Sequence, residues 1–135
     1  MKQKSFDESP VQNADIQRYT LGKNRCKQIG EFVENDDLNG FKLWGVTKLE
    51  MNTLRFEYNM NLLQLVCHEE ASNILNYLVL QLENDKAAKK QMVEHRDGHL
   101  GSQAIHLAAA TGNHIIIETL IVHFNVNVYE TTLSK

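Results

Sequence analysis

The sequence contains few of the residues that break helices. Its 135 residues include one proline and seven glycines, about half the usual share of these two residue types. Collagen-like, linker-like and turn-rich all-β architectures are therefore disfavoured, and helices are favoured. A chain of this length has room for one domain with a single core, which argues against separate cofactor and substrate modules.

Cysteine is also scarce, with Cys26 and Cys67 as the only two. Two cysteines in helix-like stretches do not make a disulfide framework and are typical of reduced thiols, so we expect a cytoplasmic protein in a reducing compartment. The first segment, MKQKSFDESPVQNADIQ, lacks the apolar region of a signal peptide and is too acidic for a transit peptide.

Neither the charge nor the hydropathy indicates a nucleic acid or a membrane as partner. The net charge is −3, with 14 basic and 17 acidic residues, and no basic footprint stands out. The longest apolar stretch, Ile115 to Val122, is interrupted by Glu118 and Thr119 and is far shorter than the ~20 residues of a membrane span. We expect a soluble protein that binds other proteins, with no nucleic-acid binding and no membrane insertion.

Apolar residues recur at helical spacing along most of the chain, and short polar turns separate the runs. The expected helices span residues 23–34, 39–47, 62–68, 72–82, 102–110 and 114–124. The second of them is expected to bury Phe41, Trp44 and Leu43. Residues 48–61 alternate imperfectly and indicate an extended connection. The charged run at residues 83–91 includes Lys86, Lys89 and Lys90. It indicates a solvated helix extension or a surface loop, with a basic docking patch as the alternative.

The last helical unit, GSQAIHLAAATGNHIIIETLIVHFNVNV, resembles an ankyrin repeat, whose pattern is G-x-T-P-L-H-x-A-A-x-x-G-H followed by I-V-x-x-L-L. The matching residues are Gly101, Ile105, His106, Ala108, Ala109, Gly112, Ile116, Ile117, Leu120 and Ile121. The same frame can be laid on two earlier units, with Gly30 and Gln64 at the position of His106. The spacings between these three anchors are 34 and 42 residues. The first is close to the ankyrin period of about 33, and we place the excess of the second in the charged run.

The resemblance implies an all-α fold, a short ankyrin-like solenoid of helical hairpins. It divides the chain into an N-terminal arm (1–22), flexible or ordered by a partner, a repeat domain (23–130) and a tail (131–135). The repeats are expected at about residues 23–52, 53–94 and 95–130. The family's threonine and proline are replaced, and Asp36 and Glu70 stand where the last unit has Gly112. That position favours positive φ, which glycine adopts most easily.

No residue pattern indicates catalysis, a metal or a cofactor. Asp97 and Gly98 separate His95 from His99 and break the helix that would align the two imidazoles, and no phosphate-binding or nucleophile-elbow motif occurs. His106 resembles the family histidine that ties neighbouring loops together. We therefore expect a protein that is not an enzyme, and we keep a small metal- or thiol-dependent enzyme using Cys67, His68, His95 and His99 as a distant alternative.

The expected function is that of a non-catalytic protein-interaction module, most simply a structural or scaffold subunit of a larger hetero-complex. A free cytosolic adaptor or inhibitor of a signalling protein is the alternative. The resemblance implies contacts on a concave face, and the apolar last helix suggests a second interface at the C-terminal edge; which of the two is the main interface stays open. The candidate contact residues are Tyr58, Met60, His68, Glu69, His99, Leu100, Ser102 and Thr111 on the concave face, and Ile115, Leu120, Val122 and Phe124 at the edge.

Overall fold

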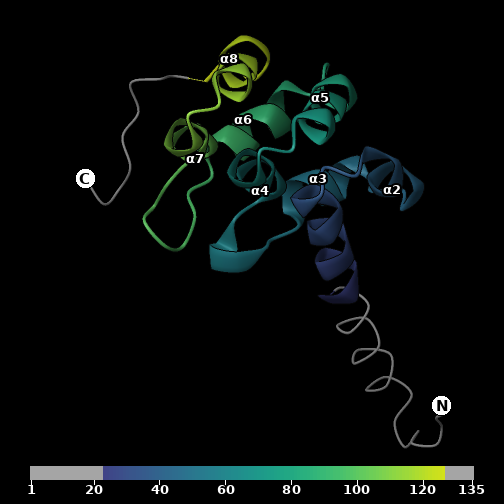
Figure 1. The fold of residues 1–135 in the computed structure, drawn as a ribbon. Coiled ribbons are helices and arrows are strands. Elements are labelled where there is room, and N and C mark those ends of the chain that lie inside the picture. The colour runs from purple at the N-terminus through teal and green to yellow at the C-terminus, as the bar shows by residue number, and fades with distance from the viewer. Residues whose placement is uncertain (1–22, 127–135) are drawn as a thin grey trace, which may run out of the picture.

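A computed structural model describes residues 23–126 of the chain, and this part is built of helices without any strand (Figure 1). No helix in this range is both long and apolar enough to cross a membrane. The predicted all-α class is confirmed for this range. The predicted arm (1–22) and tail (131–135) lie outside the described residues.

The helices follow one another through short connections. A helix that includes residues 23–34 comes first. The others are α2 (Leu38–Leu43), α3 (Lys48–Thr53), the 3-10 turn η1 (Glu57–Asn59), α4 (Leu62–Glu69), α5 (Ser72–Gln81), α6 (Lys86–Glu94), α7 (Ala104–Thr111) and α8 (His114–His123).

Helices at corresponding positions of successive hairpins pack against one another. α4 packs most extensively against α7, its counterpart in the next hairpin, while α5 contacts α2 on one side and α8 on the other. In Figure 1, α4 lies between α3 and α7, and α5 lies next to α8. The described part is therefore held together by contacts between neighbouring hairpins as well as within them.

Each of the three hairpins has one sharp turn between its two helices. Each of these turns contains a residue with positive φ. These residues are Asp36 (φ 48°), Glu70 (φ 58°) and Gly112 (φ 72°). Their spacings of 34 and 42 residues repeat those of the sequence frame. The prediction that Asp36 and Glu70 occupy the backbone position of Gly112 is confirmed.

The two side chains at these turns reach forward to the next hairpin. The Asp36 carboxylate accepts hydrogen bonds from the backbone N–H groups of Asn73 (3.1 Å) and Ile74 (3.0 Å) in the first turn of α5. The residue that precedes α5, Ala71, has no side chain that could cap it, so Asp36 supplies the cap from another unit. Glu70 likewise accepts a hydrogen bond from the amide of Asn113, before α8 (3.1 Å). Acidic residues at these turns thus link one unit to the next.

The segment 48–61, predicted to be extended, contains a helix, so that prediction is wrong. α3 begins at a capping box in which Thr47 and Glu50 satisfy each other's backbone N–H groups. Most of the charged run lies in α6, which is capped by the Asp85 side chain and buries Ala88 and Met92. Contrary to the prediction, the extra residues of the second spacing are therefore not confined to the charged run but are shared between two helices. α5 has 10 residues where α2 has 6, and α6 has 9 where α3 has 6.

The core is centred on α4, whose residues Leu62 to Cys67 are all buried. Phe41 is fully buried as predicted, and its ring meets the edge of the Tyr77 ring with centroids 6.0 Å apart. Leu43 is 86% exposed and Trp44 is 40% exposed, so the prediction that they are buried is wrong. α2 ends at Leu43, which places Trp44 in the following turn against Phe32, and Phe41 is the buried residue of α2, whereas Leu43 faces solvent.

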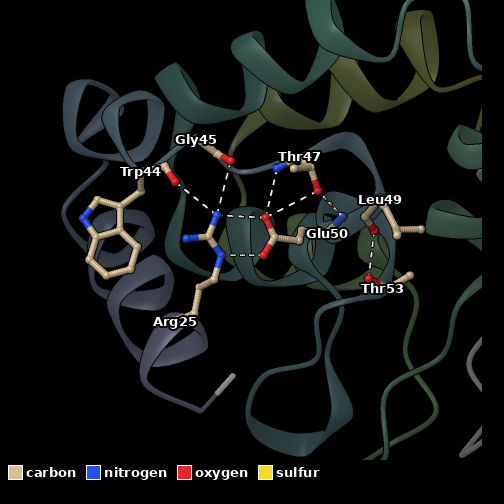
Figure 2. Close-up of polar contacts among 7 residues, drawn as sticks. All are labelled: Arg25, Trp44, Gly45, Thr47, Leu49, Glu50 and Thr53. Atoms are coloured by element: carbon tan, nitrogen blue, oxygen red, sulfur yellow. Dashed lines mark hydrogen bonds and ion pairs between the residues drawn. The ribbon is translucent and has the colours of Figure 1, made fainter. Parts of the chain in front are cut away.

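An ion pair fastens the helix of residues 23–34 to α3 (Figure 2). The Arg25 guanidinium donates hydrogen bonds to both carboxylate oxygens of Glu50 and to the carbonyl oxygens of Trp44 (3.1 Å) and Gly45 (3.2 Å). The hydrogen bond from Arg25 lowers the pKa of Glu50, and the hydrogen bond to Glu50 raises the pKa of Arg25. One side chain therefore holds the α2–α3 turn and the first turn of α3 together.

Candidate interaction surfaces

Two loops from successive units lie side by side at one edge of the described part. The backbone N–H of Gly98 donates to the carbonyl oxygen of Tyr58 (2.6 Å), and a ring nitrogen of His95 lies 2.8 Å from the carbonyl oxygen of Asn59. Tyr58 and Asn59 both have φ of 57°. A Cβ atom at position 98 would lie 3.3 Å from the Tyr58 carbonyl oxygen, so glycine permits the close approach of the two loops.

The second loop is shaped by a carboxylate. One oxygen of Asp97 accepts hydrogen bonds from four successive backbone N–H groups, those of residues 99–102, at 3.0–3.2 Å. Partial burial on its own raises the pKa of Asp97, but the four N–H groups outweigh it and hold the pKa below its usual range. An ionised Asp97 thus fixes the backbone that carries His99 and Leu100.

Buried amides tie this loop to α4. The Gln64 side chain donates to the carbonyl oxygens of Ser102 (2.7 Å) and His95 (3.0 Å), and it accepts from the backbone N–H of Asn61 (2.8 Å). Asn61 donates to the carbonyl oxygen of Met92 at the end of α6 (2.9 Å). In the next unit, His106 takes the corresponding capping position and accepts from the Gln103 N–H (2.9 Å). Gln64 thus ties neighbouring loops together in the way expected for His106, and the role of His106 itself stays a prediction.

Three predicted contact residues lie on these loops. The rings of Tyr58 and His99 lie 5.1 Å apart. Tyr58 is 63% exposed, and Leu100 is 51% exposed. We call Tyr58, His99 and Leu100 the loop cluster. Met60 and Ser102 are buried, so the prediction that they face a partner is wrong: each lies where its loop turns inward to begin the next helix.

The remaining predicted residues of the concave face lie at the ends of α4 and α7. His68 is exposed and Glu69 is half-buried at the end of α4, and Thr111 is half-buried at the end of α7. The Thr111 hydroxyl donates to the carbonyl oxygen of Ala108 (2.8 Å). Contact of these three with a partner stays a prediction.

The predicted C-terminal edge is divided between core and surface. Leu120 and Phe124 are buried, so the prediction that they contact a partner is wrong; they share one face of α8 with Ile116, at four-residue spacing. Ile115 (70% exposed) and Val122 (63% exposed) lie seven residues apart on the solvent-facing side, and their contact with a partner stays a prediction. Sequence reasoning missed two further exposed side chains, Ile121 and Leu80. We call Ile115, Val122 and Ile121 the α8 patch.

A hollow of about 630 Å³ lies between α6 and the end of α8, and we call it the α6–α8 hollow. Sequence reasoning did not place it, because its two walls are distant in sequence. The only signal was the spacing of Lys86, Lys89 and Lys90, which puts three cations on one side of a helix. The hollow is lined by Lys86, Lys89, Lys90, Val93, Glu94, Gln103, Val122, His123, Phe124, Asn125 and Val126.

The residues of the alternative enzyme lie in separate environments. Cys67 is fully buried, and that burial raises the pKa of its thiol. His95 lies against a backbone carbonyl and His99 against the Tyr58 ring. Among residues 23–126, no three His, Cys, Asp or Glu side chains come together in a way that could hold a metal ion.

Comparison of the chain with protein-family models, with curated proteins and with solved structures finds no match.

Proposed function

We propose that this chain is a divergent ankyrin-like solenoid that acts as a non-catalytic protein-interaction module, in the form of a structural or scaffold subunit of a larger protein assembly. The observation that carries the proposal is the α8 patch. Ile115 and Val122 are large apolar side chains on the outer side of the last described helix, each more than half exposed. Exposed apolar patches on a helix surface mark association sites.

The repeated geometry of the hairpins supports the ankyrin-like part of the proposal. Three turns with positive φ recur at one position of the frame. Capping boxes begin α4 and α7, and the loops that precede these helices lie side by side. The units depart from the two-helix ankyrin pattern in having α3 and α6 before these loops.

The environment of the reactive side chains supports a non-catalytic role. A nucleophilic cysteine needs an accessible thiolate, whereas Cys67 is buried with a raised thiol pKa. Two carboxyl groups with a lowered pKa, those of Glu50 and Asp97, have structural partners. Glu50 pairs with Arg25, and Asp97 accepts hydrogen bonds from backbone N–H groups.

The proposal is tested by crosslinking and mass spectrometry of the full chain expressed in cells. A photo-crosslinking residue at position 115 or 122 is expected to capture one recurring partner protein. The double variant Ile115→Glu with Val122→Glu is expected to abolish this capture, because two charges would have to be buried without partners.

The matched control places glutamate at two apolar side chains at the other end of the described part, Leu43 and Leu49, which are also highly exposed. This control is expected to leave the capture intact. The proposal is wrong if the purified chain stays monomeric and stable, binds no hydrophobic dye, and yields the same crosslinks with glutamate at positions 115 and 122 as without it.

A further inference from the structure

The α6–α8 hollow shares Val122 with the α8 patch but adds cations and further apolar walls, which the patch does not have. Its volume of about 630 Å³ lies within the ~300–1,000 Å³ of clefts that hold a ligand. Apolar side chains come from both walls: Val93 from α6, and Val122, Phe124 and Val126 from α8 and the residues after it. A large apolar group can be buried there.

The charges around the hollow are mostly positive, although the whole chain carries −3. Its lining holds three lysines and one glutamate. Lys89 is already engaged, because its ammonium donates to the carbonyl oxygens of Glu83 (3.3 Å) and His123 (3.2 Å). The Glu83 carbonyl lies just beyond the C-terminal end of α5, and the His123 carbonyl lies at the C-terminal end of α8. The C-terminal end of a helix has a partial negative charge, so the ammonium of Lys89 neutralises part of the negative charge at two helix ends.

The other two lysines are available to a ligand. No carboxylate among residues 23–126 pairs with Lys86. Lys90 pairs with Glu94 one helical turn away (3.4 Å), and both side chains are largely exposed. An exposed pair of this kind contributes little, so Lys90 can turn to a ligand at small cost.

We propose that the α6–α8 hollow binds an acidic peptide segment of a partner protein, in which carboxylates flank one or two large apolar side chains. The apolar side chains enter the hollow, and the carboxylates pair with Lys86 and Lys90. The inference rests on the proposed function, because it gives the chemical class of partner that an interaction module would recognise at this position.

The shape and the size of the positive region favour a peptide over a polyanionic surface. Two available lysines beside a concave apolar wall match two or three carboxylates and an apolar anchor. A nucleic acid or an anionic membrane would meet the same two lysines on a chain of net charge −3, which repels extended negative surfaces.

The test measures binding of a fluorescent synthetic octapeptide to the full chain by anisotropy. The peptide has leucine and phenylalanine at its centre and three glutamates on each side. Saturable binding is expected, and raising the salt concentration should weaken it. A peptide with two alanines at the centre, and one with lysines in place of the glutamates, should each bind at least tenfold more weakly.

Variants locate the site. Lys86→Glu combined with Lys90→Glu should raise the dissociation constant at least tenfold, and the corresponding glutamine pair should have an intermediate effect. Lys27→Glu with Lys48→Glu is the matched control, because both lysines are exposed, both lie outside the hollow and the change in net charge is identical. This control should shift the constant less than twofold. Circular dichroism checks that α6 stays helical.

Nuclear magnetic resonance separates this inference from the proposed function. Peptide addition should shift the methyl signals of Val93 and Val126 and leave that of Ile115 unchanged. Shifts confined to Ile115 would overturn the inference while the interaction module stands. Equal loss of binding in the two glutamate pairs, absence of binding at millimolar peptide, or tighter binding to vesicles containing phosphatidylserine would also overturn it. Absence of any captured partner at position 115 of the otherwise unchanged chain, a position outside the hollow, with peptide binding intact, would count against the proposed function alone.

Discussion

Replacing the acidic residues at the first two hairpin turns by glycine should have opposite effects on stability. Both Asp36 and Glu70 adopt positive φ, which costs a residue with a side chain ~1–2 kcal/mol, less for aspartate. Glycine removes this cost, but its greater conformational freedom stabilises the unfolded chain and so lowers the stability of the folded protein. The sign of each change therefore depends on what the lost side chain contributed.

Asp36 contributes more than Glu70. Its carboxylate accepts from two backbone N–H groups of α5, a cap worth ~1–2 kcal/mol, so Asp36→Gly should cost about 1 kcal/mol net. Glu70 makes one exposed hydrogen bond, to Asn113, worth at most about 0.5 kcal/mol. Glu70→Gly should therefore stabilise the protein by about 0.5 kcal/mol.

Urea unfolding followed by circular dichroism measures both effects. With an m-value of about 1.5 kcal/mol/M, the midpoint should fall by roughly 0.7 M for Asp36→Gly and rise by roughly 0.3 M for Glu70→Gly. Gly112→Ala calibrates the backbone term, because a Cβ atom there meets nothing within 4 Å and the expected loss of about 1 kcal/mol is purely conformational. A loss of stability for Glu70→Gly comparable to that of Asp36→Gly would refute the reasoning.

Further predictions concern buried and ionised groups. Gln64→Leu leaves the His95 carbonyl and the Asn61 N–H without partners and removes one of the two donors to the Ser102 carbonyl, which should cost ~3 kcal/mol in urea unfolding; Gln64→His should cost less, and equal costs would contradict the role of the amide. Asp97 has a lowered pKa, so its contribution is complete above the ordinary carboxyl pKa of ~4 and is lost as the pH falls through the lower folded value. Asp97→Asn should therefore be less stable than wild type at pH 7, with a gap that narrows towards pH 2; a gap independent of pH would contradict this. A thiol reagent should label the partly exposed Cys26 well before the buried Cys67 in the native protein, and equal rates would contradict the burial of Cys67.

The frame of the hairpins can be predicted from sequence because it depends on local patterns. Apolar residues at helical spacing locate α4, α5, α7 and α8 to within two residues at most ends. The position of each turn can be predicted from Gly112, because Asp36 and Glu70 stand at the same place in the frame and adopt the same positive φ. The forward reach of these two acidic side chains cannot be predicted, since it depends on how one hairpin is placed on the next.

The incorrect predictions have identifiable physical causes. The six residues of α3 contain few apolar side chains and so give little sign of a helix, although threonine followed three residues later by glutamate is a capping signal. Leu120 and Phe124 are difficult to assign to core or surface because α8 is apolar on nearly every side. A helix of that kind has no single apolar stripe to show which face is buried, and only the packing of α8 against α5 and α7 decides it.

The long second spacing of the repeat frame accounts for the α6–α8 hollow. α5 and α8 have ten residues each, whereas α2 has six. Because they begin at equivalent turns and pack side by side, the carbonyl groups at and just beyond their ends come close enough for one ammonium, that of Lys89, to bind both. The hydrogen bond from Lys89 to His123 holds α6 beside the end of α8. There the other two lysines of α6, Lys86 and Lys90, border apolar side chains. An outer helix as short as α2 would end about one turn earlier and would not bring α6 to this position, so the irregular spacing is what creates the hollow.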